Sequence, residues 1–219
     1  MPTVLITGAN RGIGLEFVHQ YRREGWDVIA TARRPDNASN LSATGASVEA
    51  LDAADPASIE ALAQRLSGRP IDVLIANAGV YPDDLDAQKW SAGFATNCIG
   101  PTLLAQALRN NVKASTERKM IAVTSRMGSI ADNSSGGATA YRATKAALNA
   151  AWHSLAIELR DDRIAVGLVH PGWVQTDMGG KGAAIDTQTS VTGLRRVIAG
   201  LKPERSGSFF NYDGEELPW

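Results

Sequence analysis

The segment AYRATKAALN (residues 140–149) places a phenol and an ammonium four positions apart. A helical turn takes about 3.6 residues, so Tyr141 and Lys145 would project from the same face of a helix. A free phenol has a pKa of about 10, and a nearby cation favours the phenolate. Lowering that pKa by about 3 units needs about 4 kcal/mol, which a desolvated ammonium can supply. The pair could therefore exchange a proton with a substrate, although it could also be an ordinary pair on a solvated helix surface.

A glycine-rich turn, TGANRGIG (residues 7–14), stands near the start of the chain. The run TVLIT (3–7) is typical of a strand, and residues 14–24 have helical spacing. Glycines at such a turn let a pyrophosphate approach the backbone, and the helix N-terminus offers N–H groups to it. A purely structural turn is the alternative, but the position favours dinucleotide binding. The expected contacts in this turn are Gly8, Asn10, Arg11, Gly12, Ile13 and Gly14.

Short apolar runs alternate with helical patterns along the chain. The expected strands are residues 3–7, 27–31, 47–51, 71–76, 119–125, 164–170 and 207–212. The expected helices are residues 14–24, 56–66 (with Asp55 as N-cap), 84–111 (broken by Gly93, Gly100 and Pro101), 139–160 and 190–200. This alternation implies right-handed crossovers and a parallel sheet. We expect an α/β, doubly wound, Rossmann-type fold, with about seven strands and helices on both faces. We expect one domain over residues 1–219, with ligands beyond the carboxyl ends of the strands.

The composition argues against several other classes of protein. The 219 residues include 22 Lys and Arg against 23 Asp and Glu, so no basic nucleic-acid surface is expected. No apolar run approaches the roughly 18 residues of a membrane span, and we expect no secretory signal because a strand begins at Thr3. Cys98 is the only cysteine, which suggests a reducing, cytoplasmic setting. The three histidines are isolated from one another, so no metal site is expected.

The order of several short motifs resembles the short-chain dehydrogenase/reductase family. They are TGxxxGxG at residues 7–14, NAG at 77–79, Asn97 within the long helical stretch, S-x-x-G at 125–128, Y-x-x-x-K at 141–145 and P-G-x-V-x-T at 171–176. The short chain and its ending NYDGEELPW resemble the small C-factor- and sniffer-like carbonyl reductases. The resemblance implies an oxidoreductase that transfers hydride between a nicotinamide and a carbonyl or alcohol.

The resemblance also implies roles for single residues. Tyr141 would be the general acid/base, Lys145 would tune it, and Ser125 would hold the substrate oxygen, with Thr124 and Ser129 as less fitting alternatives. Asn97 would hold a water that links Lys145 to solvent, or it could simply bend its helix. Asp52 would touch the adenine, or it could cap a turn. The cofactor contacts expected beyond the glycine turn are Asp52, Asn77, Ala78, Gly79, Tyr141, Lys145, Pro171, Gly172, Val174 and Thr176.

The end of the second strand favours NADP(H) over NAD(H). NAD-binding Rossmann folds carry an acidic residue there for the ribose 2′-hydroxyl, whereas this chain has TARRP (31–35). Arg33, together with Arg11 of the glycine turn, could bind a 2′-phosphate, because guanidinium groups bind phosphate bidentately. Arg34 could equally be a surface residue that keeps the protein soluble.

We therefore expect an NADP(H)-dependent carbonyl reductase or alcohol dehydrogenase with a small-molecule substrate. The alternative is a dinucleotide-binding signalling or regulatory protein with little turnover, which would need neither the serine nor the tyrosine of the reacting set. The substrate pocket is expected to be open and weakly selective. Its candidate apolar lining residues, which could equally be packing residues, are Trp173, Met127, Tyr81 and Trp219. The resemblance also implies a homodimer or homotetramer paired through residues 84–111 and 139–160.

Overall fold

The computed structural model describes residues 1–82, 84 and 86–219. A parallel sheet of seven strands runs through its centre in the order β3-β2-β1-β4-β5-β6-β7. The strands are β1 (Thr3–Ile6), β2 (Asp27–Ala32), β3 (Ser47–Ala50), β4 (Val73–Ala76), β5 (Lys119–Val123), β6 (Ala165–His170) and β7 (Phe209–Asn211). The strand order reverses between β1 and β4, which is where doubly wound sheets bind their ligands. The expected Rossmann-type fold is confirmed.

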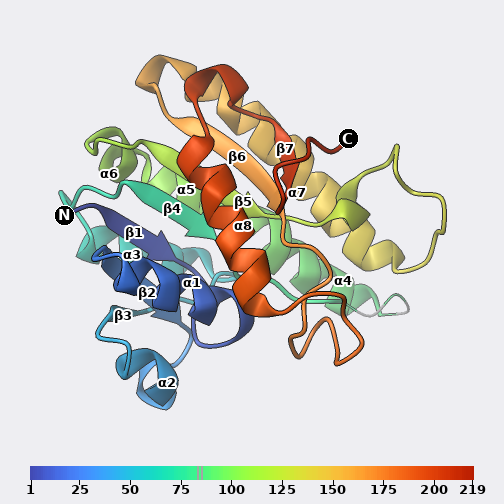
Figure 1. The fold of residues 1–219 in the computed structure, drawn as a ribbon, viewed down its shortest axis with the longest axis horizontal. Helices are drawn as coiled ribbons and strands as arrows, with labels where there is room; N and C mark the ends of the chain where they lie inside the picture. The colour runs from blue at the N-terminus through green and yellow to red at the C-terminus, as the bar shows by residue number, and fades with distance from the viewer. Residues whose placement is uncertain (83, 85) are drawn as a thin grey trace.

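Helices cover both faces of this sheet (Figure 1). They are α1 (Gly12–Arg23), α2 (Ser39–Ser42), α3 (Pro56–Arg65), α4 (Ala87–Phe94), α5 (Gly100–Ala107), α6 (Arg109–Lys113), α7 (Thr139–Glu158) and α8 (Thr187–Gly200), with the π-helical turn η2 (Ala95–Ile99) and the 3-10 turns η1 (Pro35–Asn37), η3 (Arg126–Gly128), η4 (Arg160–Asp162) and η5 (Pro203–Arg205). On one face α1 and α8 bury Phe17 and Leu194, and on the other α3, α5 and α7 bury Leu62, Leu104 and Trp152. Among the described residues, no helix is both long and apolar enough to cross a membrane.

Capping side chains set the starts of two helices. The Asp55 carboxylate accepts a hydrogen bond from the Ala57 N–H at 3.0 Å, as predicted for α3. Helix α8 begins at Thr187 rather than at residue 190, because Asp186 caps it by accepting from the Thr189 N–H at 2.7 Å. The sequence pattern missed α2, a single short turn.

The stretch expected to be helical over residues 84–111 is divided at Gly100 and Pro101 as predicted, because η2 ends and α5 begins there, but Gly93 lies inside α4; residue 85 of the stretch lies outside the described residues. A further break, at Leu108 after α5, was not predicted. Gly93 and Gly100 also permit close packing, because a Cβ atom would lie 2.9 Å from Pro82 Cγ and 1.7 Å from the Ala53 carbonyl oxygen, respectively. Single π-helical turns inside α-helices are often found at functional sites.

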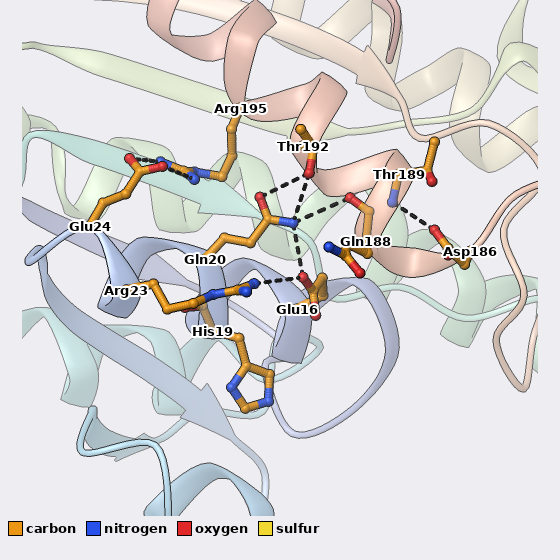
Figure 2. A network of polar contacts seen from close by, with 10 residues as sticks. All are labelled: Glu16, His19, Gln20, Arg23, Glu24, Asp186, Gln188, Thr189, Thr192 and Arg195. Atoms are coloured by element: carbon orange, nitrogen blue, oxygen red, sulfur yellow. Dashed lines mark hydrogen bonds and ion pairs between the residues drawn. The ribbon is translucent and has the colours of Figure 1, made fainter.

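A seam of polar side chains joins α1 to α8 (Figure 2). Gln20 of α1 donates to the Gln188 carbonyl at 3.3 Å and to Thr192 Oγ1 at 3.2 Å. Farther along α8, Arg195 forms a two-point ion pair with Glu24, just beyond the end of α1. Because α1 begins inside the glycine turn, this seam helps to fix the turn at the carboxyl end of β1.

Both outer strands of the sheet have neighbours on their open sides. The segment after β7 returns antiparallel along it, and the Leu217 N–H donates to the Phe209 carbonyl at 2.7 Å. At the opposite edge, Arg65 of α3 donates to the Glu49 carboxylate and to the Ala50 carbonyl of β3, both at 2.8 Å. The two edge strands thus contact other parts of the same chain.

Candidate active site

A cleft of about 1610 Å³ opens at the carboxyl ends of the strands, where β1 and β4 diverge. Most of the predicted site residues line it: Gly8, Asn10, Arg11, Gly12, Ile13, Gly14, Arg33, Asp52, Asn77, Ala78, Gly79, Tyr141, Lys145, Pro171 and Thr176. Four others within the described part of the chain, Asn97, Ser125, Gly172 and Val174, are not among the lining residues. Segments from the whole length of the chain therefore meet in one cleft.

The glycine turn is shaped by Asn77, which follows β4. Its Nδ2 donates to the carbonyls of Thr7 at 2.9 Å and Gly8 at 3.2 Å. A Cβ on Gly14 would lie 2.3 Å from the Gly8 oxygen and 2.7 Å from Asn77 Nδ2, so no side chain fits there. Gly8 and Gly12 have φ angles of +62° and +55°, which favour glycine. The turn therefore brings bare backbone to the cleft beside the N-terminus of α1, an arrangement that suits a phosphate.

Arg11 has a partner that sequence reasoning missed. It was expected to bind a phosphate together with Arg33, but its guanidinium forms an ion pair with Asp177, which also lines the cleft. Asp177 belongs to the segment after β6, and no local pattern shows that this segment reaches the glycine turn. Arg33 lies exposed in the cleft just beyond β2. Asp52 lines the cleft, and its carboxylate accepts from the Ala54 N–H at 3.0 Å, as expected of a residue that caps a turn.

Tyr141, Lys145 and Ser125 come together beside the end of β5. Both α7 residues are buried, with 8% and 4% of their surface exposed. Lys145 Nζ lies over the Tyr141 ring, 5.9 Å from its centroid, and donates to the Val123 carbonyl at 2.9 Å. The Ser125 hydroxyl lies close enough to the Tyr141 phenol to lower its pKa. A hydroxyl, a phenol and an ammonium thus lie near one another at the end of β5.

The turn after β5 explains why serine and glycine are spaced as S-x-x-G. Gly128 packs on α7 so closely that a Cβ would lie 2.8 Å from the Lys145 carbonyl carbon. The two alternative hydroxyls are engaged elsewhere: Thr124 Oγ1 donates to Asn149 Oδ1 at 2.7 Å, and Ser129 Oγ accepts from the Asp132 N–H at 3.0 Å. Ser125 Oγ also accepts from the Met127 N–H at 3.2 Å, but its hydroxyl is the one that affects the pKa of Tyr141, so it is the best placed of the three to act with that residue.

The electrostatics of the pair differ from the sequence-based expectation. The pKa of Tyr141 is raised to about 12, chiefly by burial; the nearby Ser125 hydroxyl opposes this rise, and Tyr81 makes a smaller contribution to it. Burial also lowers the pKa of Lys145 to about 8. For the protein's own groups the shift of the Tyr141 pKa is therefore opposite to the predicted lowering, because desolvation of the phenolate is its largest cause and Lys145 is not among the groups that shift this pKa. Tyr141 is therefore protonated at neutral pH, the form that can donate a proton.

Asn97 lies at the centre of η2 and is almost completely buried. Its Nδ2 donates to the Val80 carbonyl at 2.8 Å and to Thr144 Oγ1 at 3.0 Å, while its Oδ1 accepts from the Val80 N–H at 2.8 Å. Both hydrogens of Asn97 Nδ2 are thus donated within the protein. The water that Asn97 was expected to hold would therefore have to bind an oxygen of this residue. A Cβ on Gly79 would lie 3.3 Å from Asn97 Oδ1 and 3.8 Å from Lys145 Nζ, so this glycine keeps space open between them.

The segment after β6 divides into lining and supporting residues. Pro171 and Thr176 line the cleft. Gly172, with a φ of +83°, packs so tightly that a Cβ would lie 2.8 Å from Ile185 Cδ1. Val174 is buried and forms a β-bridge with Ile185. Gly172 and Val174 therefore shape the segment that carries the other two to the cleft.

The predicted apolar lining is only partly correct. Tyr81 lines the cleft, but Trp173, Met127 and Trp219 are not among its described lining residues. Trp219 instead stacks on Phe209, with ring centroids 5.7 Å apart. An exposed methionine that sequence reasoning missed, Met178, lines the cleft in their place.

Comparison with known proteins agrees with this geometry. A family model described as short chain dehydrogenase matches residues 2–184. The C-signal protein of Myxococcus xanthus is 45% identical over 166 residues, which are 74% of this chain and 100% of that protein. The crystal structure of NADPH-bound carbonyl reductase from chicken fatty liver is 34% identical, with a TM-score of 0.93 over 100% of this chain and 99% of that one. The carbonyl reductase Sniffer of D. melanogaster is 32% identical, with a TM-score of 0.93 over 100% of both chains.

Proposed function

This chain belongs to the short-chain dehydrogenase family of oxidoreductases, and on that premise we propose that it is an NADP(H)-dependent carbonyl reductase or alcohol dehydrogenase. The observation that carries the proposal is that the buried Tyr141 has Lys145 over its ring and the Ser125 hydroxyl nearby, at the end of β5. A protein that only binds a dinucleotide has no need of this set of side chains, so the regulatory alternative is not favoured.

The residues of the cleft fit a dinucleotide. The glycine turn and the start of α1 would hold the pyrophosphate, and Arg33 would bind the 2′-phosphate, since residues 31–35 at the end of β2 carry two arginines and no acidic residue. Asp52 would lie near the adenine. Residues 77–79, Pro171 and Thr176 would flank the nicotinamide. The NADPH bound to the chicken carbonyl reductase supports this choice of cofactor.

When bound, NADP(H) supplies or accepts a hydride at the nicotinamide ring, and its oxidised form adds a positive charge that favours the phenolate. In reduction, Ser125 donates a hydrogen bond to the carbonyl oxygen as that oxygen gains negative charge. Tyr141, protonated because burial raises its pKa, transfers its proton to the same oxygen to complete the alcohol. Lys145, whose pKa burial lowers to about 8, can return a proton to Tyr141 at neutral pH. The space beside Gly79 and Asn97 would connect Lys145 to solvent.

Two measurements test the proposal. We expect NADPH to bind at least about tenfold more tightly than NADH, and Arg33→Ala to remove most of this difference by weakening NADPH alone. Tyr141→Phe should keep NADPH binding within about twofold and lower kcat for aldehyde reduction by about a hundredfold or more, the usual contribution of a general acid. Equal affinity for both dinucleotides would overturn the cofactor assignment. Undiminished turnover in Tyr141→Phe would move the chemistry to another residue.

We also propose that residues 1–219 form a single domain. This is supported by the two apolar clusters, which lie on opposite faces of one continuous sheet.

A further inference from the structure

Tyr81 belongs to none of the motifs that predict the site, yet it lies directly against Tyr141. The two rings stack with centroids 4.6 Å apart and planes inclined by 25°. Tyr81 lines the cleft, and 53% of its surface is exposed. One side of its ring therefore contacts the proposed proton donor, while much of the remainder is open to a molecule in the cleft.

The chain on both sides of Tyr81 is anchored to the helices behind the site. The N–H and carbonyl of Val80 are both bonded to the Asn97 side chain at 2.8 Å. On the other side, the Asp84 carboxylate accepts from the Ala140 N–H at 2.7 Å, at the N-terminus of α7. A carboxylate there is favoured by the helix dipole. Tyr81 is thus held in place over the helix that carries Tyr141.

A substrate with its carbonyl oxygen between Ser125 and Tyr141 would place the attached group beside Tyr81. The other large apolar side chains of the described lining that are exposed are Val80, next to Tyr81 in the chain, and Met178, whose unbranched side chain can adapt to many shapes. The tyrosine ring is the rigid, flat element of this lining. Aromatic rings bind other flat groups well in offset-stacked or edge-to-face geometry, whereas a puckered ring makes fewer close contacts.

Resting on the proposed function, we propose that Tyr81 is a specificity-determining residue whose ring forms a flat wall of the substrate site. The protein accordingly favours carbonyl compounds attached to an aromatic or conjugated planar group over saturated compounds of the same size. The phenol hydroxyl of Tyr81 is not needed for this preference, because the ring face makes the contact.

The first test measures binding without turnover. Benzamide and cyclohexanecarboxamide have rings of equal carbon number, flat in one and puckered in the other, and neither is reduced. Their dissociation constants are measured with the NADPH-loaded wild type and with the Tyr81→Leu, Tyr81→Phe and Trp173→Leu variants. We expect Tyr81→Leu to lower the preference for benzamide by about fivefold, as loss of one aromatic pair implies. Tyr81→Phe should retain the preference, as should Trp173→Leu, which removes an exposed aromatic ring outside the described lining.

The second test compares benzaldehyde with cyclohexanecarbaldehyde as substrates. Tyr81→Leu should lower the ratio of their kcat/KM values by about fivefold through KM, with NADPH affinity unchanged. An unchanged ratio in both tests, or an equal change in Trp173→Leu, would overturn the role of Tyr81. Failure of the wild type to reduce either aldehyde would instead refute the proposed function, while the amide ratio would still decide whether Tyr81 forms the wall.

Discussion

Replacing Lys145 by methionine should make the protein more stable at neutral pH, although Lys145 belongs to the proposed reacting centre. The lysine is 4% exposed, and its ammonium has exchanged water for the Val123 carbonyl and the face of the Tyr141 ring. Methionine has a similar length and no charge, so it can fill the same space without the desolvation penalty. A residue kept for function is here expected to destabilise the fold.

The magnitude follows from the pKa of Lys145. Burial lowers that pKa from 10.5 to about 8, and at about 1.36 kcal/mol per pH unit the buried charge costs about 3 kcal/mol. The folded protein binds this proton less tightly than the unfolded chain. The cost is therefore fully present below pH 8 and disappears as the pH rises toward 10.5. Loss of the hydrogen bond to Val123 removes about 1 kcal/mol, which leaves the variant about 2 kcal/mol more stable at pH 7.

Urea unfolding followed by tryptophan fluorescence at pH 7, 8, 9 and 10 measures this difference. The advantage of Lys145→Met should fall from about 2 kcal/mol at pH 7 to about 1 kcal/mol at pH 9 and to roughly zero at pH 10. Lys202→Met provides a matched control, because the Lys202 side chain is exposed to solvent. Its difference from the wild type should be small and independent of pH.

Two results would refute this reasoning. If Lys145→Met were less stable than the wild type at pH 7, the hydrogen bond and the ring contact would outweigh the desolvation of the charge. If the variant were more stable by a constant amount from pH 7 to pH 10, packing rather than ionisation would be the cause.

Two further predictions concern the cofactor end of the cleft. Asp177→Asn should remove the ion-pair partner of Arg11, so that Arg11 can bind a phosphate of the cofactor. NADPH affinity should then rise about threefold at low salt, whereas NADH affinity should change little. A gain in NADPH affinity that persists at high salt would speak against an ionic cause. Because the Arg11–Asp177 pair is 70% and 77% exposed at its side chains, unfolding free energies should change little. Gly14→Ala should weaken NADPH binding by tenfold or more in a titration, since its Cβ would lie 2.3 Å from the Gly8 oxygen. Gly200→Ala is the control, as nothing lies within 4 Å of its Cβ, and a similar loss in that variant would contradict the steric argument.

Local patterns in the sequence predicted the parts of the site that depend on periodicity. The four-residue spacing of Tyr141 and Lys145 holds in α7, and Ser125 follows β5 as expected. These positions depend on helical pitch and on parallel strands ending at one edge of the sheet, and both can be inferred from short stretches of sequence.

The contacts that the sequence did not predict join segments far apart in the chain. Asp84 meets Ala140 across 56 positions, and Arg11 meets Asp177 across 166. The Asn97 side chain, within the widened turn η2, likewise bonds Val80 in a different segment. The direction of the Tyr141 pKa shift was mispredicted for a related reason. The spacing of residues indicates that a cation is near, but only the packed structure shows how deeply the phenol is buried.

The contacts on the outer sides of β3 and β7 restrict how copies of this molecule can associate. An uncovered edge strand can template hydrogen bonding with a strand from another chain, the first step toward continuous intermolecular sheets. Here the returning segment occupies the Phe209 carbonyl on one side, and the Arg65 guanidinium occupies the Ala50 carbonyl on the other. Strand addition is thereby disfavoured at the β7 edge, and at the β3 edge Arg65 removes one of the acceptors that an added strand would use.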